Sequence, residues 1–365
     1  MNSMSTNTVL YRTLARALSI KRPHNTTGSQ QMTAWLIEHL PKGQHYHVDA
    51  AGNVHVDARK HDKNRTLFVA HVDTVHRVTG PNKIRKTWDT WYAQGAPLGA
   101  DDGAGCAMLM HLLCAGVGAY YIFTQGEEVG GIGAKYVSDN TDLLKQFDRA
   151  IAFDRKGVDS VITHQGMGRC CSDAFAQALS DAFNEDDRLM YLPDDTGVYT
   201  DTAEFTGIIP ECTNISVGYY SEHTDKEKLD VIHLQALADR CLRIDWDGLA
   251  TKRDPSVHDS KWGTAEVWDT QSWYTGKDTR SHYTLDDELD YEFYDALEMA
   301  LVGNKKYLID LMAEAVYPEE PALARRLINP KALTEKVLYE AENLSQAYTA
   351  KEVLTTLFSE AYCEA

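Results

Sequence analysis

The segments FVAHVDTV (residues 68–75), GADDGAG (99–105) and TQGEEVGG (124–131) decide the fold of this chain. Each lies next to an apolar run and is flanked by small residues. In an open α/β sheet, polar groups that follow buried strands gather at one edge, where ligands bind. The stretch from Phe68 to Gly133 therefore predicts carboxylates and an imidazole at strand ends, where they can hold a metal ion.

The chain around this stretch alternates between strand and helix patterns. Continuous apolar runs over 66–70, 119–123 and 149–153 are typical of strands buried on both faces of a sheet. Shorter strands are expected over 160–163 and 214–218, and helices over 8–18, 103–113, 172–183 and 232–244, together with one capped by Ser29 and one that starts at Gly131. This alternation predicts an α/β fold over residues 1–250, with a mostly parallel central sheet and helices on both faces.

Two regions are expected to lie outside this pattern. A Gly-Asn turn predicts a polar hairpin over residues 48–56, and the nearby His45, His47 and His55 are interpreted as surface residues rather than ligands. Residues 77–97 are rich in Trp, Lys and Gly, and they indicate a loop that can include a short hairpin.

The last part of the chain, residues 251–365, has a different composition. Residues 252–284 are low in aliphatic side chains and read as a connector, whereas 285–365 is expected to be a largely helical extension. The extension holds 17 acidic against seven basic residues, which is more than half of the net charge of −18. We interpret it as a helical appendage with a solvated acidic face; the alternative is a module for a protein partner or for self-association.

Composition excludes several classes of function. A net charge of −18 argues against broad contact with nucleic acid or an anionic membrane. No apolar run approaches the length of a membrane helix, and the N-terminus lacks the pattern of a signal peptide. Seven cysteines, including the pair Cys170-Cys171, lack zinc-finger spacing and suit a reducing compartment. The sequence therefore predicts a cytoplasmic protein.

The strand ends offer the donors that a pair of zinc ions needs. Two zinc ions about 3.5–4 Å apart share a carboxylate, and each binds a further imidazole and carboxylate. The candidates are His71, Asp101, Glu128, Asp154 and His223. Each is weak evidence alone, since a single histidine after a strand, such as His223, is often an ordinary polar residue. Their order and their placement at strand ends favour a metal-dependent amide hydrolase.

Two further acids are candidates for catalysis. Asp73 follows His71 by two residues and points to the same side of an extended strand, so it can accept the other imidazole N–H. Glu127 and Glu128 are adjacent, and their side chains diverge. This suits one of them as a metal ligand and the other as a general base.

Together these motifs resemble those of the co-catalytic di-zinc peptidases, a clan that includes the double-zinc aminopeptidases, the glutamate carboxypeptidases, peptidase T and the succinyl-diaminopimelate desuccinylases. The resemblance covers roughly residues 30–245. It implies that Asp101 bridges two zinc ions, with a cis peptide before Asp102. By the same resemblance, His71 and Asp154 complete one site, Glu128 and His223 complete the other, Glu127 is the general base and Asp73 orients His71. Manganese or cobalt suits the same donors.

The spacing of the motifs narrows the resemblance. The stretch between Asp154 and His223 is too short for the domain that desuccinylase-type enzymes insert there, so the chain is most similar to the single-domain aminopeptidases. A short peptide or another small amide is the expected substrate, and an N-acyl amino acid deacylase or carboxypeptidase is the alternative. Arg155 and Lys156 can bind a substrate carboxylate or be ordinary surface cations. A non-catalytic member that docks a partner is a further alternative, although a structural zinc site has no use for Glu127.

Overall fold

The computed structural model describes residues 6–165, 168–257, 312 and 354. The expected C-terminal helical extension and most of the connector lie outside these residues. Among the described residues, no helix is long and apolar enough to cross a membrane.

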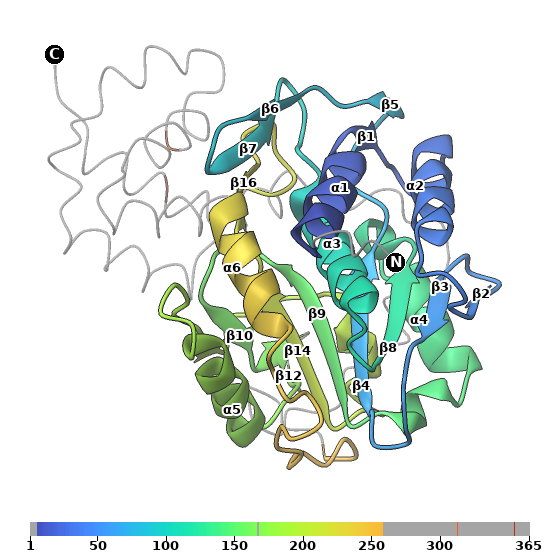
Figure 1. The fold of residues 1–365 in the computed structure, drawn as a ribbon, viewed down its shortest axis with the longest axis vertical. Coiled ribbons are helices and arrows are strands. Elements are labelled where there is room, and N and C mark those ends of the chain that lie inside the picture. The colour runs from blue at the N-terminus through green and yellow to red at the C-terminus, as the bar shows by residue number, and fades with distance from the viewer. Residues whose placement is uncertain (1–5, 166–167, 258–311, 313–353, 355–365) are drawn as a thin grey trace, which may run out of the picture. The chain divides into compact units, whose positions relative to one another are not determined.

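The described chain is built around an eight-stranded sheet with the order β13-β10-β14-β9-β4-β8-β3-β2 (Figure 1). The strands are β2 (Tyr46–Val48), β3 (Val54–Asp57), β4 (Thr66–His71), β8 (Tyr120–Thr124), β9 (Arg149–Arg155), β10 (Ser160–Ile162), β13 (Leu192–Asp194) and β14 (Glu211–Ser216). The four central strands, β14-β9-β4-β8, are parallel to one another. The predicted mostly parallel sheet is therefore confirmed.

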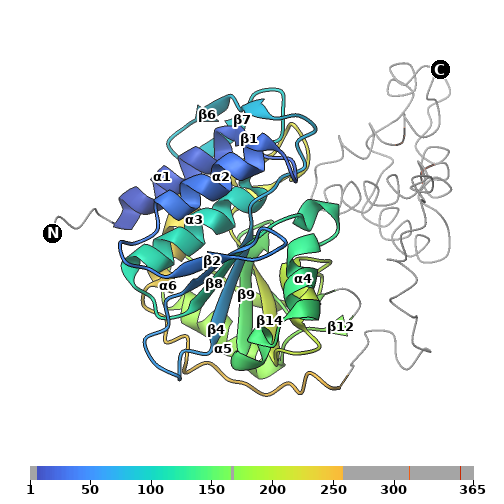
Figure 2. The ribbon, with the colours of Figure 1, turned by 90° about the vertical axis from the view of Figure 1, so that its right-hand side faces the viewer.

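Helices cover both faces of the sheet. They are α1 (Thr6–Leu18), α2 (Thr27–Glu38), α3 (Ala100–Ala115), α4 (Ile132–Asn140), α5 (Asp173–Asn184) and α6 (Val231–Cys241), with the short 3-10 helices η1 (Glu127–Val129), η2 (Leu143–Gln146) and η3 (Asp201–Phe205). Figure 2 shows α1, α2, α3 and α6 on one face and α4 on the other. The fold class predicted from the alternation of strands and helices is thus confirmed for the described residues.

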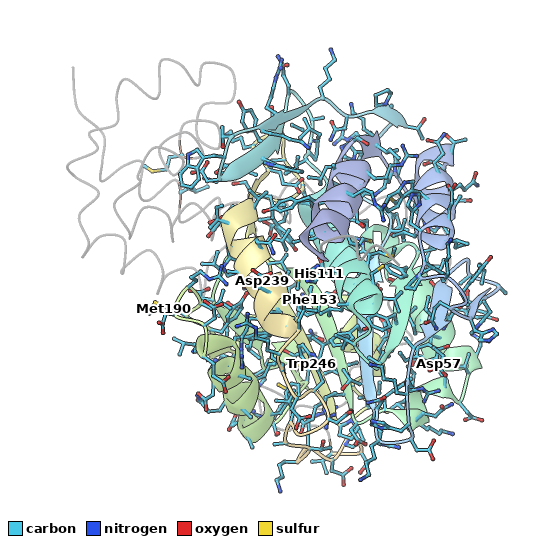
Figure 3. The ribbon with its side chains drawn as sticks, in the orientation of Figure 1. Asp57, His111, Phe153, Met190, Asp239 and Trp246 are labelled. Carbon is cyan, nitrogen blue, oxygen red and sulfur yellow. The ribbon has the colours of Figure 1, made fainter. Side chains whose placement is uncertain are left out.

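Each face of the sheet has its own hydrophobic core, because successive side chains of a strand point to opposite sides. In β4, Phe68 packs into the larger core and its neighbour Val69 into the smaller one. The ring of Phe68 lies 6.0 Å from Phe153 and 4.9 Å from Trp246, measured between centroids. Phe153 and Trp246 are labelled in Figure 3. A continuous apolar run was the correct signal for such a strand.

A second, four-stranded sheet lies beside the central one, with the order β15-β16-β7-β6. Its strands are β6 (Ile84–Lys86), β7 (Thr90–Ala93), β15 (Tyr219–Tyr220) and β16 (Lys228–Asp230). Strands β6 and β7 form the short hairpin expected within residues 77–97. Strands β15 and β16 pair in antiparallel fashion, so the loop 221–227 projects from them. The remaining short strands are β1 (Ile20–Lys21), β5 (Gly80–Pro81), β11 (His164–Gln165) and β12 (Gly168–Arg169).

Two sequence expectations need correction. His55 is buried, because β3 pairs with β8 inside the central sheet, and its Nε2 lies 3.1 Å from the carboxylate of Asp49. His45 and His47 are exposed, as expected. Helix α2 is capped by Thr26 rather than Ser29, because the Ser29 hydroxyl accepts from the backbone N–H of Thr26 within a capping box.

Candidate metal centre

The polar motifs meet at the carboxyl end of the parallel strands. His71 is the last residue of β4, and Asp154 lies near the end of β9. Asp101 stands at the start of α3, where the chain is not yet helical. Glu128 belongs to η1, just after β8, whereas His223 comes from the loop between β15 and β16. The structure thus brings together the five side chains proposed as ligands.

These side chains form two groups that share Asp101. His71, Asp101 and Asp154 make one group and Asp101, Glu128 and His223 the other, with the donor atoms of each group within 4.8 Å of one another. Asp101 Oδ1 lies 3.0 Å from His71 Nε2, and Asp101 Oδ2 lies 3.1 Å from His223 Nε2. His71 Nε2 is 3.7 Å from Asp154 Oδ1, and His223 Nε2 is 3.2 Å from Glu128 Oε2.

The geometry of both groups fits a divalent cation. Ligand atoms about 2.0–2.2 Å from a tetrahedral ion are roughly 3.4 Å from each other, close to the separations found here. Among the residues that the structure describes, the second carboxylate oxygen of Glu128 is buried and has no hydrogen-bond partner. Burial, followed by the charge of Asp101, raises the pKa of both Asp154 and Glu128. A cation would relieve this crowding of buried carboxylates.

Glu127 lies beside the first group and outside both. Its Oε2 is 3.9 Å from His71 Nε2, and burial raises its pKa well above the ordinary value. Gly126 and Gly130, both with positive φ, bracket the single turn of η1, which carries Glu127 and Glu128. The two side chains diverge from this turn, so only Glu128 faces the second group. Glu127 therefore lies beside the first group without belonging to either group.

Asp73 is fully buried and contacts the same turn. Its Oδ1 accepts hydrogen bonds from the backbone N–H groups of Gly126, at 2.7 Å, and Glu127, at 3.3 Å. The same oxygen is 3.7 Å from His71 Nδ1, which lies closer to the Asp73 backbone carbonyl, at 3.2 Å. Asp73 thus contacts both His71 and the turn that carries Glu127, and the second of these contacts was not foreseen.

Sequence reasoning missed the side chains that hold the proposed ligands. Asp102 accepts from the backbone N–H of His71, at 3.1 Å, and the expected cis peptide joins it to Asp101. Thr200 and Tyr219 donate hydroxyl hydrogen bonds to the two oxygens of Asp154, at 2.8 and 3.0 Å. Asp102 was visible as part of its motif. Thr200 and Tyr219 reach Asp154 only through the fold.

Asn53 holds both ends of the turn segment that contains Glu127 and Glu128. Its side-chain oxygen accepts from the Gln125 N–H and its amide donates to the Gly133 carbonyl, both at 3.0 Å. The segment 125–133 is therefore closed by one buried amide. The hairpin that contains Asn53 was predicted, but its role was not.

The two cations next to Asp154 already have partners. Arg155 donates to the Thr196 hydroxyl at 3.0 Å and lies 3.9 Å from Asp194, and Lys156 is 3.3 Å from Glu222. These contacts favour the interpretation of both as surface cations over a role in binding a substrate carboxylate.

A mostly parallel sheet whose carboxyl edge gathers two histidines and two carboxylates around a shared aspartate defines a metal-dependent hydrolase. Residues 53–246 match the model of peptidase family M28, which is more than half of the chain. The chain therefore belongs to peptidase family M28, and it is a metallopeptidase. The resemblance to the co-catalytic zinc peptidases is confirmed. No curated protein matches the sequence.

Solved structures of peptidases share the fold. A tripeptidase of Staphylococcus aureus is 16% identical with a TM-score of 0.55, over 66% of this chain and 97% of that one. The aminopeptidase PepT of Bacillus cereus is 14% identical with a TM-score of 0.51, over 66% and 97%. The TET1 peptidase of Pyrococcus horikoshii is 14% identical with a TM-score of 0.52, over 64% and 98%. At these identities the likeness concerns the fold.

Proposed function

We propose that the chain is an aminopeptidase that hydrolyses short peptides with two zinc ions. The observation that carries the proposal is the position of Asp101, whose two oxygens face His71 and His223 respectively. Two metal positions would share this carboxylate. The first would be completed by His71 and Asp154, and the second by Glu128 and His223. Manganese or cobalt suits the same nitrogen and oxygen donors.

The residues of the chain have distinct tasks in this proposal. Metal ions bound at the two positions would lower the pKa of a water molecule and polarise the scissile carbonyl. Glu127 takes the proton of the attacking water at its carboxylate and then gives it to the leaving amine. Asp73 fixes the backbone of the η1 turn, which carries Glu127, by accepting from the N–H groups of Gly126 and Glu127. Thr200 and Tyr219 hold the carboxylate of Asp154 in place.

The charges around the site favour a substrate with a free amine. Two bound metal ions would balance the charge of the four carboxylates among the proposed ligands and base, so the choice of substrate terminus depends on the charged side chains around them. Arg155 and Lys156 already have polar or acidic partners, so neither is poised to receive a C-terminal carboxylate. This observation supports an aminopeptidase over a carboxypeptidase or an N-acyl amino acid deacylase.

Metal content and substrate choice test the proposal together. Elemental analysis of the purified full-length chain should find about two metal ions per molecule. Release should occur from aminoacyl anilides and short peptides with a free N-terminus, and not from the same compounds N-acetylated. Turnover of N-acylated substrates alone would favour the deacylase, and a well-folded sample without transition metal would contradict the proposal.

We also propose a division into a catalytic domain and a C-terminal extension that serves a partner or self-association. The TET1 peptidase of Pyrococcus horikoshii, which shares the fold, can assemble into a tetrahedron or an octahedral shell. Residues just past the boundary expected at residue 250 still bind the catalytic domain, since Glu211 accepts from the backbone N–H of Lys252 and Arg253. We therefore place the boundary after residue 253, whose backbone N–H makes the last of these contacts. Activity and size in solution of a chain ending there would test the division.

The cysteines support a cytoplasmic setting. The six cysteines among the described residues are free, which suits a reducing compartment. Fractionation of cells that make the tagged full-length protein would test this part of the proposal.

A further inference from the structure

Glu227 is a buried carboxylate that contacts the backbone around Asp101. It lies in the loop between β15 and β16, four residues after His223, and only 1% of it is exposed. Its two oxygens accept hydrogen bonds from the N–H groups of Gly99, at 3.0 Å, Ala100, at 2.6 Å, and Asp101, at 3.2 Å. One side chain thus joins the loop of His223 to the backbone of the residue shared by both metal groups.

The turn that Glu227 binds is also held from its other side. Gly99 has a φ of +75°, and its carbonyl accepts from the guanidinium of the buried Arg22 at 3.2 Å. A Cβ at this position would come within 3.2 Å of Thr74 and 3.3 Å of His76. The backbone before Asp101 is therefore held between the side chains of Glu227 and Arg22, and the positive φ and close neighbours of Gly99 disfavour a side chain there.

The two metal groups differ in how their histidines are supported. His71 is 1% exposed and is held as part of β4 in the middle of the central sheet. The His223 side chain is 52% exposed, and its backbone has a φ of +65°, which is unfavourable for a residue other than glycine. His223 lies in the loop between β15 and β16 rather than on a strand of the central sheet. The hydrogen bonds from Glu227 to the turn at Asp101 are therefore what anchors its loop.

We propose that Glu227 is a positioning residue that sets the affinity of the second metal position, formed by Asp101, Glu128 and His223. The inference rests on the proposed two-metal function. Residues that orient metal ligands typically change the affinity for the metal by about 10–100-fold. Loss of the Glu227 contacts frees the His223 loop but leaves His71 and Asp154 on their strands. The first metal position keeps these two ligands in place and shares only Asp101 with the second position, so its affinity should fall less.

Substitution by glutamine makes a sharp test. In Glu227→Gln one acceptor oxygen becomes an NH₂ group, which faces backbone donors instead of accepting from them. The matched control is Asp225→Asn, because Asp225 lies in the same loop but is exposed to solvent. Asp225→Asn shows the effect of losing an exposed carboxylate from the same loop, and Glu227→Asp, which keeps the buried carboxylate, separates the hydrogen-bond geometry from the charge.

The experiment is a competitive zinc titration of the metal-free full-length protein against a chromophoric chelator. We expect two dissociation constants for the natural sequence and for Asp225→Asn. In Glu227→Gln one constant, that of the second position, should rise about 10–100-fold, and the other should change much less. Glu227→Asp, which keeps the charge but is shorter, should give an intermediate constant and replaces Glu227→Gln if that variant does not fold by circular dichroism.

The outcomes separate the two proposals. If the natural sequence binds two ions and Glu227→Gln leaves both constants unchanged, or weakens both equally, the role of Glu227 is overturned while the two-metal site stands. If the natural sequence binds fewer than two ions, both proposals fall.

Discussion

Buried carboxylates at the two ends of the central strands differ in how completely they are hydrogen-bonded. At the amino end of β14, Glu211 is fully buried, and its oxygens accept from Ser172, Lys252 and Arg253 at 2.6–3.1 Å. At the carboxyl end, one oxygen each of Asp73, Glu128 and Asp201 is buried and has no hydrogen-bond partner within the described part of the chain. A charge that the protein satisfies fully serves the fold, whereas a group of charges left short of partners is available to a ligand.

The largest effect on turnover is expected for Glu127, the proposed general base at the carboxyl end. Glu127→Gln keeps the size of the side chain but cannot accept a proton, so kcat should fall by at least about 10²–10⁴-fold. The metal content should stay at its natural level, because Glu127 lies outside both ligand groups. Peptide hydrolysis and elemental analysis of the same sample measure the two quantities.

The exposed Glu38→Gln is the matched control for this prediction and should change neither quantity. Loss of metal together with activity in Glu127→Gln would assign Glu127 to the ligands instead.

A substitution at the amino end should lower the stability of the fold rather than the rate of catalysis. Glu211→Ala removes the buried acceptor that four part-buried donors share, and each donor that water cannot reach costs about 1–3 kcal/mol. We therefore expect a lower free energy of unfolding in urea, with kcat per folded molecule close to natural. If Glu211→Ala has normal stability and poor turnover, the assignment of the amino end to stability and the carboxyl end to catalysis is wrong.

Sequence alone identified the carboxyl end far better than the residues that support it. His71, Asp101 and Asp154 follow apolar runs within a few residues, so local pattern was enough to group them. Asn53 and Glu227 act on segments 72 and 126 or more positions away in the chain, through contacts that only the folded sheets create. His55 was misjudged for the same reason, since a polar hairpin does not reveal that its second strand pairs inside the sheet.

A smaller effect on turnover is expected for Asn53, which combines the full hydrogen bonding of the amino end with a place at the carboxyl end. It is fully satisfied, like the groups at the amino end, yet it holds the segment that contains Glu127 and Glu128. Asn53→Ala should lower kcat about tenfold, because looser positioning of catalytic groups costs rate even when none is removed. Steady-state kinetics on a free-amine peptide measures the change. Unaltered kcat would show that the backbone bond between Gly133 and Gln125, at 2.8 Å, closes the segment unaided.

The smallest effect should appear at His76, a satisfied group near the carboxyl end. Its ring bonds the Thr74 hydroxyl at 2.8 Å and the Pro97 carbonyl at 2.9 Å. Since Thr74 also receives the N–H of Arg22, this arrangement suits a neutral imidazole. Burial, followed by the charge of Arg22, lowers the pKa of His76 to about 4. The unfolded chain therefore binds a proton near pH 6.5 that the folded chain refuses, so stability is complete above that pH and falls as the pH drops toward 4.

At pH 5.5 this difference in proton binding is worth about 1 kcal/mol. Urea unfolding of the metal-free protein at pH 7.5 and 5.5 measures it, since the removal of metal excludes competition between protons and the ion. His76→Gln has no titrating group, so it should lose about 1 kcal/mol less than the natural chain between the two values. Its lower stability at both values, from the changed bonds to Thr74 and Pro97, cancels in this comparison. An equal loss of unfolding free energy in both proteins would mean that folded His76 binds its proton as readily as the unfolded chain does. A hydrogen-bonded group at the carboxyl end would then not exclude its proton.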